Sequence, residues 1–419
     1  MNSIQFRGVR IFDGTGDLPF FGSVVTRGQV IERVIRSDEI VQEPDCLVID
    51  GHGNMLMPGL VEAHAHLTFP SSIGRLFNGL DLPSEDHLLV AAYNARVLLD
   101  HGFTSAYSAG SRGQRFEVAL RNEIDAGYLP GPRLRASSQE TSGSVTIGLP
   151  RSHDGQHERT AAGLKRYVAD MARMGVDSIK FELSGNDVDE AGGSSRILFD
   201  EEEVAAIGQQ ARESEVWLTC HAQAAGSIKQ ALRHGFRALY HCTLADDEAL
   251  DMLEQSRADV FVVPAPGLPY ARVHEGADFG IDSATAKRMG ALDSLEGMVR
   301  VCPELRKRGV RVLPGGDYGF ACNPIGRNAR DLQLFVELLG FSPLETLVAA
   351  TRYGGELMGL RIGMVRPGYL ADLLLVEGDP LSDIKVLQHK ANLRAVMKGG
   401  QFHKMPELTG QASVCFGAP

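Results

Sequence analysis

Residues 57–67 read MPGLVEAHAHL and place two histidines, His64 and His66, two positions apart at the end of an apolar run. Side chains at positions i and i+2 of a β-strand lie on the same side of the strand. Both imidazoles therefore face one space at the carboxyl end of a strand, and this arrangement can bind a metal ion. A pair of ordinary polar residues where a strand gives way to a loop would look the same. The rest of the chain must decide between the two.

From residue 57 onward, apolar strand candidates alternate with helical segments, and several of these segments end at glycine. The strand candidates are MPGLVEAHAHL, FTSAYSAG, PRLRASSQE, SIKFELSG, VWLTCHA, RALYHCT, DVFVVPA and VRVLPGGD. Each is followed by at least one helical segment. Uniformly apolar strands in this number favour the α/β class, and within it a closed, TIM-like (β/α)8 barrel over an open sheet.

The two ends of the chain have a different pattern. Residues 1–56 contain short alternating strands separated by turn signals such as DGTGD, and strand signals return near the C-terminus in DLLLVEGDP and LRAVMKGGQFH. We expect residues 1–56 and 357–419 to form one small β-sandwich domain. Residues 57–356 then form the barrel.

Composition excludes several classes of function. A hydrophobic content of 43% and a charged content of 23% are ordinary for a soluble globular protein. The net charge of −11 and the lack of a long basic run argue against a nucleic-acid partner. No apolar stretch is long enough to span a membrane, and the first residues lack a secretory apolar core. The cysteines are scattered without metal-site spacing, so we expect reduced thiols in a cytoplasmic protein.

Polar residues stand at the ends of the strand candidates, where active sites of (β/α)8 barrels are found. They are His64 and His66 on the first strand, Lys180 on the fourth, His221 on the fifth, His241 on the sixth and Asp317 on the eighth. Nitrogen and carboxylate ligands that converge from several strands suit Zn²⁺, Mn²⁺ or a related divalent ion. This set makes a chance arrangement improbable.

These residues and several longer segments resemble the amidohydrolase superfamily, in its imidazolonepropionase-like and prolidase-like branch. MPGLVEAHAHL resembles the first metal strand of that family, although Glu62 stands where an aspartate is common. SIKF is similar to its lysine strand and GGD at 315–317 to its last metal strand. ATRYGGELMG, GMVRPGYLADLLLVEGDPL and LRAVMKGGQ resemble its C-terminal segment, so the resemblance covers nearly the whole chain.

The resemblance implies one or two divalent metal ions, with zinc as the first candidate. His64, His66 and Asp317 would bind the more buried ion, and His221 and His241 would bind the second. Lys180 would bridge both ions as a carbamate formed with CO2. Without carboxylation, an ammonium has no lone pair and would repel two cations. Part of the family lacks this lysine and holds one metal ion, so the number of ions stays open.

Glu182 offers an alternative to Lys180. Strand alternation places the two side chains on the same side, so Glu182 could supply the bridging carboxylate or accept a hydrogen bond beside the metal centre. We favour Lys180.

The chemistry of a divalent ion then suggests a mechanism. Bound water has a pKa lowered toward 7, and Asp317 would take its proton and pass it to the leaving amine. His241 or Tyr240 would help to polarise the scissile carbonyl. Tyr318, Phe320 and Asn328 follow the last strand and are candidate substrate contacts. Loop aromatics that merely cover a barrel mouth, and an N-capping asparagine, are the alternatives.

We therefore expect a metal-dependent amidohydrolase that cleaves a C–N bond in an amide, urea, carbamate or anilide of a small, aryl-bearing molecule. GGDYGF followed by NARDLQLFVELLGFSPLE resembles the phenylurea- and carbamate-type hydrolases. The alternative is a prolidase-like Xaa-Pro dipeptidase, for which the sequence reveals no group that would hold a free carboxylate. A non-catalytic assembly protein on the same fold is a third possibility, disfavoured because all six ligand positions are present. We also expect a homo-oligomer.

Overall fold

The computed structural model describes residues 3–36, 46–142 and 160–406. The chain forms two compact units. The first, here called the terminal unit, contains Met1–Val61, Leu98–Ser105 and Ser342–Pro419. The second, the central unit, contains Glu62–Val97 and Ala106–Phe341. The boundaries at residues 57 and 356 remain a prediction.

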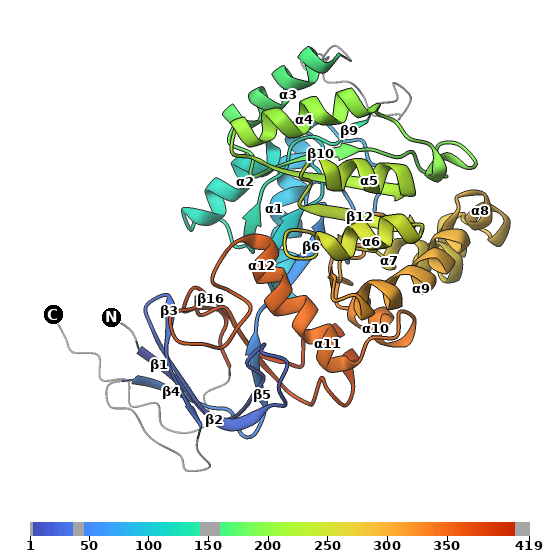
Figure 1. Ribbon diagram of the computed structural model, residues 1–419. Coiled ribbons are helices and arrows are strands. Elements are labelled where there is room, and N and C mark those ends of the chain that lie inside the picture. The colour runs from blue at the N-terminus through green and yellow to red at the C-terminus, as the bar shows by residue number, and fades with distance from the viewer. Residues whose placement is uncertain (1–2, 37–45, 143–159, 407–419) are drawn as a thin grey trace. The chain divides into compact units, whose positions relative to one another are not determined.

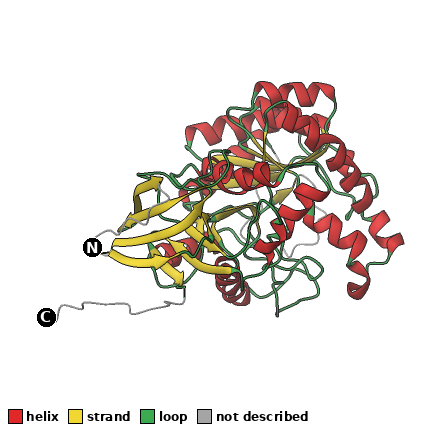
Figure 2. Ribbon diagram, turned by 90° about the horizontal axis from the view of Figure 1, so that it is seen from below, coloured by secondary structure: helices red, strands yellow, loops and turns green. Residues whose placement is uncertain are grey.

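The terminal unit is built on an eight-stranded sheet to which both ends of the chain contribute. The sheet order is β17 (Gln401–Lys404), β16 (Leu393–Lys398), β15 (Leu373–Val376), β5 (Met55–Pro58), β1 (Ser3–Ile11), β2 (Phe20–Arg27) and β3 (Val30–Arg36), and β4 (Cys46–Asp50) pairs with β1. The antiparallel pairing of β15 with β5 joins the C-terminal strands to the N-terminal ones. Figure 2 distinguishes the strands, in yellow, from the helices, in red. The described strands form one sheet, where the sequence led us to expect a sandwich of two.

The central unit contains parallel strands and helices. Five strands pair in chain order in a parallel sheet: β10 (Ser178–Glu182), β11 (Trp217–Ala224), β12 (Ala238–Leu244), β13 (Phe261–Val263) and β14 (Arg311–Val312). β9 (Thr141–Ser142) pairs with the other side of β10. β6 (Leu60–Ala65), β7 (Phe103–Ser108) and β8 (Arg133–Arg135) form a three-stranded sheet, in which the first residues of β6 and β7 are counted in the terminal unit. A parallel bridge between Ser137 and Ser178 connects the segment after β8 to β10. The α/β class is therefore as the sequence predicts.

Helices follow most of these strands. They are α1 (Ser84–Asp100), α2 (Phe116–Asp125), α3 (Ala161–Arg173), α4 (Glu201–Glu213), α5 (Ala225–Arg233), α6 (Asp247–Gln255), α7 (Gly267–His274), α8 (Ser283–Arg288), α9 (Ala291–Lys307) and α10 (Arg330–Glu337), with α11 (Pro343–Val348) and α12 (Gly354–Met358) in the terminal unit. Side-chain caps fix where several of them begin. Thr160 and Asp246 accept backbone N–H groups at the starts of α3 and α6, and Asp200 forms a capping box with Glu203. Helices α3 to α6 lie beside strands β10 to β12 (Figure 1).

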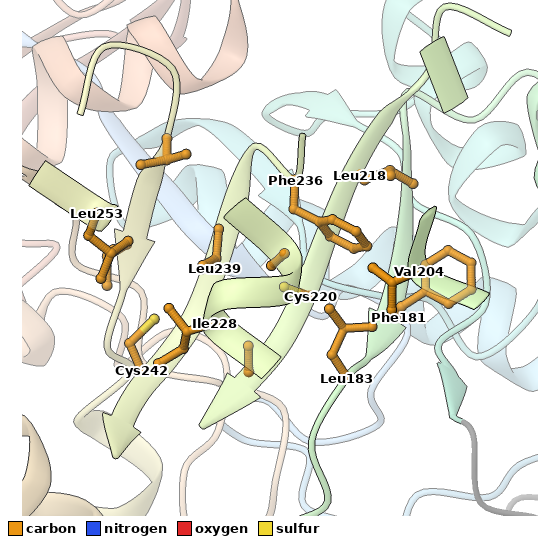
Figure 3. Packing of buried hydrophobic residues seen from close by; sticks show 14 of the residues in the cluster. Phe181, Leu183, Val204, Leu218, Cys220, Ile228, Phe236, Leu239, Cys242 and Leu253 are labelled. Atoms are coloured by element: carbon orange, nitrogen blue, oxygen red, sulfur yellow. The ribbon is translucent and has the colours of Figure 1, made fainter. Parts of the chain in front are cut away.

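The core of the central unit lies between these strands and helices. Alternate strand residues such as Phe181 and Cys220 are fully buried in one apolar cluster, together with Val204 of α4 and Ile228 of α5 (Figure 3). Because side chains alternate along a strand, the residues between them face the opposite side. The helices thus fix one face of each strand, and the other face is left for the polar residues of the site.

Candidate active site

The six side chains predicted as metal ligands line a single cavity in the central unit. They are His64 at the end of β6, His66 just after it, Lys180 of β10, His221 of β11, His241 of β12 and Asp317 in the loop after β14. Cys220 and Cys242 alternate with two of these histidines and lie in the apolar cluster instead. The fold of the central unit thus brings together residues that are up to some 250 positions apart in the sequence. His64 and Asp317 are an example.

Three of the six come close enough to share one ion. One ligand atom from each of His64, His241 and Asp317 lies within 4.8 Å of the others. His66 Nε2 lies 3.3 Å from Oδ1 of Asp317. Buried His64 Nδ1 has no hydrogen-bond partner among the described residues. A buried polar atom without a partner typically costs about 1–3 kcal/mol, and a bound cation in this site would offset such costs. The donors present therefore fit a divalent ion.

Burial disfavours the charged form of three histidines in the cavity, His64, His221 and His241. It lowers the pKa of His64 and of His241 well below the usual histidine value, and it lowers the pKa of His221 to about 4. The nearby Lys180 charge acts in the same direction on His221. At neutral pH the imidazoles therefore keep their lone pairs, and this is the form that binds metal.

The backbone at two of the candidate ligands is strained. His241 has φ of 75° and Asp317 has φ of 58°, the left-handed region that non-glycine residues rarely adopt. Such conformations cost on the order of 1–3 kcal/mol each and cluster at functional sites. The fold therefore holds both side chains in place against a local preference for another backbone conformation.

Lys180 has a partner that the sequence did not reveal. Its side chain is almost completely buried, and its Nζ lies 2.9 Å from the carboxylate of Glu140 and donates to the carbonyl of Ala109 at 2.7 Å. Glu140 was the last residue of the third strand candidate, and that position at a strand end was the available signal. Glu182 also lines the cavity, and burial raises its pKa to about 8. Burial therefore disfavours the charged form of Glu182, whereas the carboxylate of Glu140 is the one that faces Lys180.

Two buried carboxyl groups accept hydrogen bonds from the segments that carry the candidate ligands His64 and Asp317. Glu62 accepts the backbone N–H of His64 at 3.0 Å and the side-chain amide of Asn328 at 2.7 Å. Asp331 accepts the backbone N–H of Gly315 and the hydroxyl of Tyr318, both at 3.0 Å. Burial raises the pKa of Glu62 to about 8 and that of Asp331 to about 7. These contacts hold the two segments that carry His64 and Asp317.

The four candidate substrate contacts differ in whether they line the cavity. Phe320 lines the cavity, and its ring lies edge-on to Phe69 at 5.4 Å. Tyr240, Tyr318 and Asn328 are absent from the described residues of the lining. Tyr240 is buried, with its ring 4.1 Å from that of His64. The hydroxyl of Tyr318 and the amide of Asn328 donate to Asp331 and Glu62.

Comparison with known proteins identifies the family. The sequence profile described as the amidohydrolase family matches residues 55–402. The chain belongs to the amidohydrolase family. It is a hydrolase that acts on C–N bonds. The family generally uses divalent metal ions, and the cluster of His64, His241 and Asp317 is a candidate site for one. None of the helices within the described ranges is long and apolar enough to cross a membrane.

Several amidohydrolases are similar over most of the chain. An ochratoxinase from Aspergillus niger is 26% identical over 385 residues, which span 84% of this chain and 76% of that protein. The crystal structure of a putative prolidase from Bifidobacterium longum is 25% identical, covers 97% of this chain and 96% of its own, and superposes with a TM-score of 0.81. Phenylurea hydrolase B, at 20% identity with 96% of each chain covered and a TM-score of 0.76, shares the fold.

Proposed function

We propose that this amidohydrolase is metal-dependent and cleaves an amide, urea, carbamate or anilide of a small, aryl-bearing substrate. The observation that carries the metal site is the convergence of His64, His241 and Asp317 within 4.8 Å. The parallel strand order and the similar solved structures support closure of the central unit into a (β/α)8 barrel, with these residues at its carboxyl-terminal mouth.

The proposed ligand set assigns a place to each of the six side chains. His64, His66 and Asp317 would hold one divalent ion, with zinc as the first candidate, and His221 and His241 would hold a second. Lys180 would bridge them as a carbamate formed with CO2. Because Lys180 is paired with Glu140, this pair must open before the amine can react. A bound divalent ion supplies Lewis acidity, which activates water and polarises the scissile carbonyl.

The remaining chemistry falls to the chain itself. Asp317 lies beside both His64 and His66, and in this proposal its carboxylate takes the proton of the attacking water. The same carboxylate then delivers the proton to the nitrogen of the leaving amine, so that the amine departs neutral.

Aromatic and apolar side chains favour an aryl-bearing substrate. Phe69 and Phe320 line the cavity with Leu268 and Pro269, and the Phe69 ring stacks on His66 with centroids 4.1 Å apart. Such walls contribute affinity for flat rings. The names of an ochratoxinase and a phenylurea hydrolase among the similar proteins agree with amide or urea cleavage.

The second candidate is a prolidase-like Xaa-Pro dipeptidase. A dipeptidase must hold a free carboxylate, and one cationic side chain in the cavity, Arg272, could do so. A solved Xaa-Pro dipeptidase is also among the similar structures, at 22% identity and a TM-score of 0.82.

The expected homo-oligomeric state and cytoplasmic location remain further parts of the proposal, whichever substrate class applies.

A substrate panel on metal-loaded protein tests the function. N-aryl ureas, anilides, carbamates and Xaa-Pro dipeptides are compared by kcat/KM, with metal content measured in the same samples. We expect N-aryl substrates to be cleaved faster than dipeptides. Faster turnover of Xaa-Pro dipeptides would replace the first candidate by the second, and no C–N cleavage in metal-replete protein would overturn both.

A further inference from the structure

The segment between β6 and α1, here called the β6–α1 loop (residues 66–83), forms part of the cavity wall. Phe69 and Leu80 of this loop line the cavity. The Phe69 ring stacks on that of His66, with centroids 4.1 Å apart. None of the described helices and strands lies within the loop. Its shape therefore depends on contacts with other parts of the central unit.

Two side chains of α1 hold the start of this loop. Asn94 donates through its amide to the carbonyls of Leu67 and Phe69, at 2.9 and 2.8 Å. His87 contacts the carbonyl between them, with 2.9 Å from its Nδ1 to the oxygen of Thr68. Both α1 side chains are almost completely buried. Three successive carbonyls at the start of the loop are therefore bound to α1.

His87 also reaches the end of the loop. Its other ring nitrogen, Nε2, accepts the backbone N–H of Leu82 at 3.1 Å. A backbone N–H only donates and a carbonyl only accepts, so the two contacts exist together in one tautomer, which carries its proton on Nδ1. Neutral His87 therefore joins Thr68 to Leu82 and holds the two ends of the loop together.

A second proton on His87 breaks one of these contacts. Imidazolium carries a proton on both nitrogens, so Nε2 then presents an N–H to the N–H of Leu82. The contact from Nδ1 to Thr68 is the same in both forms. Protonation therefore releases the end of the loop and leaves its start in place.

The surroundings of His87 favour the neutral ring. Burial lowers its pKa, and the charge of Arg112, which follows β7, acts in the same direction. The carboxylates of Asp81 in the loop and Asp86 at the start of α1 act in the opposite direction, while α2 contributes the uncharged ring of Phe116. Because the net shift is downward, His87 in the closed loop gains its second proton only below the ordinary histidine value of 6.5.

We propose that His87 is a positioning residue that keeps the β6–α1 loop closed around the aryl group of the substrate, and that its protonation opens the loop and weakens substrate binding. The inference rests on the proposed function and adds regulation by pH to the same site. Loss of the Leu82 contact frees the end of the loop that carries Leu80, which lines the cavity. The adjacent Asp81 is ion-paired with Arg112, another residue of the lining.

The competing explanation is that His87 is only a buried polar side chain whose hydrogen bonds the fold satisfies. Such a residue would hold the loop equally well at every pH. A proton-sensitive residue holds the loop above the histidine range and releases it below that range. The two explanations therefore differ in the pH dependence of the loop.

His87→Gln keeps both contacts without the titration. Its amide offers an N–H to Thr68 and an oxygen to Leu82, and it is neutral at every pH. Hydrogen exchange of the loop backbone is measured on metal-free protein at about pH 7.5 and about pH 5.5, on either side of the histidine range, and corrected for the intrinsic effect of pH on exchange. At the lower pH, protection near Leu82 should fall about 3- to 10-fold in the native protein, as for one lost hydrogen bond, and stay constant in His87→Gln.

Two further variants complete the exchange experiment. Leu82→Pro has no N–H to oppose protonated His87, so it should abolish the pH response although the histidine is retained. It also decides the question if His87→Gln does not fold. His389→Gln, at an exposed histidine, is the matched control and should respond to pH as the native protein does.

Binding of an aryl ligand connects the loop to the site. Propionanilide tests cleavage, and 1-phenyl-2-butanone, in which a CH2 group replaces the amide nitrogen, cannot be cleaved as an amide. Between about pH 7.5 and about pH 5.5 the Kd of this ketone should rise about 3- to 10-fold more in the native protein than in His87→Gln, a comparison in which the titration of other groups cancels.

These measurements separate the inference from the proposed function. If neither propionanilide nor any other C–N substrate is cleaved, the proposed function fails, and the exchange and ketone experiments still judge His87. An equal response of the native protein and His87→Gln to pH, or no response in the native protein, would overturn the inference.

Discussion

The Nζ atom of Lys180 lies 2.9 Å from a carboxylate oxygen of Glu140. Both groups are withdrawn from solvent, with side-chain exposures of 1% and 21%. Each charge is compensated mainly by the other, and removal of one partner leaves the other uncompensated. In the proposed mechanism this pair would have to open before Lys180 could react with CO2.

Glu140→Gln should make Lys180 easier to carboxylate. Without the carboxylate of Glu140, no ion pair holds the Lys180 nitrogen that would react with CO2. In bicarbonate labelled with carbon-13, metal-free Glu140→Gln should show a stronger carbamate carbon signal than the metal-free native protein. Lys180→Ala is the control and should show no such signal. A weaker signal in Glu140→Gln would mean that Glu140 assists the carbamate rather than competes with it.

Lys180→Ala should be nearly inactive and partly rescued by short-chain carboxylic acids. The substitution would remove the proposed bridging group, and an added carboxylate of the right size could take its place between the two proposed cations. Activity is measured against acetate and propionate concentration, with metal content determined at each point. Full activity in Lys180→Ala without any added acid would contradict a bridging role.

His66→Ala should lower bound metal and activity together. His66 lies 3.3 Å from Asp317 at the proposed buried ion, and a lost ligand weakens that site. Metal is measured after dialysis, and thermal unfolding is followed with and without added zinc, because an ion that binds only the native state raises its stability. His389→Ala, at an exposed histidine, is the matched control and should behave as the native protein. Full retention of metal in His66→Ala would contradict the assignment of His66 as a metal ligand.

Asp317→Asn should lose the proton shuttle while its shape is kept. General acid–base catalysis typically contributes about 10²–10⁴-fold, so we expect kcat to fall by at least that order. Circular dichroism and metal analysis of the same sample show whether fold and ion are retained. Near-native kcat in a folded, metal-replete variant would rule out Asp317 as the base.

Glu117, which is not one of the proposed metal ligands, predicts a pH dependence of stability. It is fully buried near the start of α2, accepts the backbone N–H of Ser137 at 3.1 Å, and burial raises its pKa to about 7. A raised carboxyl pKa means that the native state holds its proton more tightly than the unfolded chain. The resulting stabilisation is complete below the unfolded value and is lost as the pH rises through about 7.

Glu117→Gln removes this titration, because its amide is neutral at every pH. Denaturant unfolding of metal-free protein should show the native chain losing about 3 kcal/mol relative to Glu117→Gln between about pH 4.5 and pH 8. Parallel pH profiles for the two proteins would show that Glu117 does not titrate in this range.

Local patterns in the sequence were sufficient to select the six side chains that the fold brings into one cavity. His64 and His66 could be predicted because strand alternation and the position of a strand end are properties of a few neighbouring residues. The same alternation accounts for Cys220, which packs in the apolar cluster and not in the cavity. The α/β class followed from a repeated strand and helix pattern, which is likewise local.

Tertiary structure alone decided which polar groups line the cavity and which form hydrogen bonds to other buried side chains outside its lining. Tyr318 and Asn328 looked like substrate contacts because they follow the last strand, but their polar atoms bind buried Asp331 and Glu62. The sequence carried no signal of comparable strength for Glu140 or Arg272. The partner of Glu140 is remote in the chain, and the sequence does not show which remote side chains come near Arg272. A sequence specifies where a side chain lies along its own strand or helix, whereas the partners that satisfy or neutralise it are brought to it only by folding.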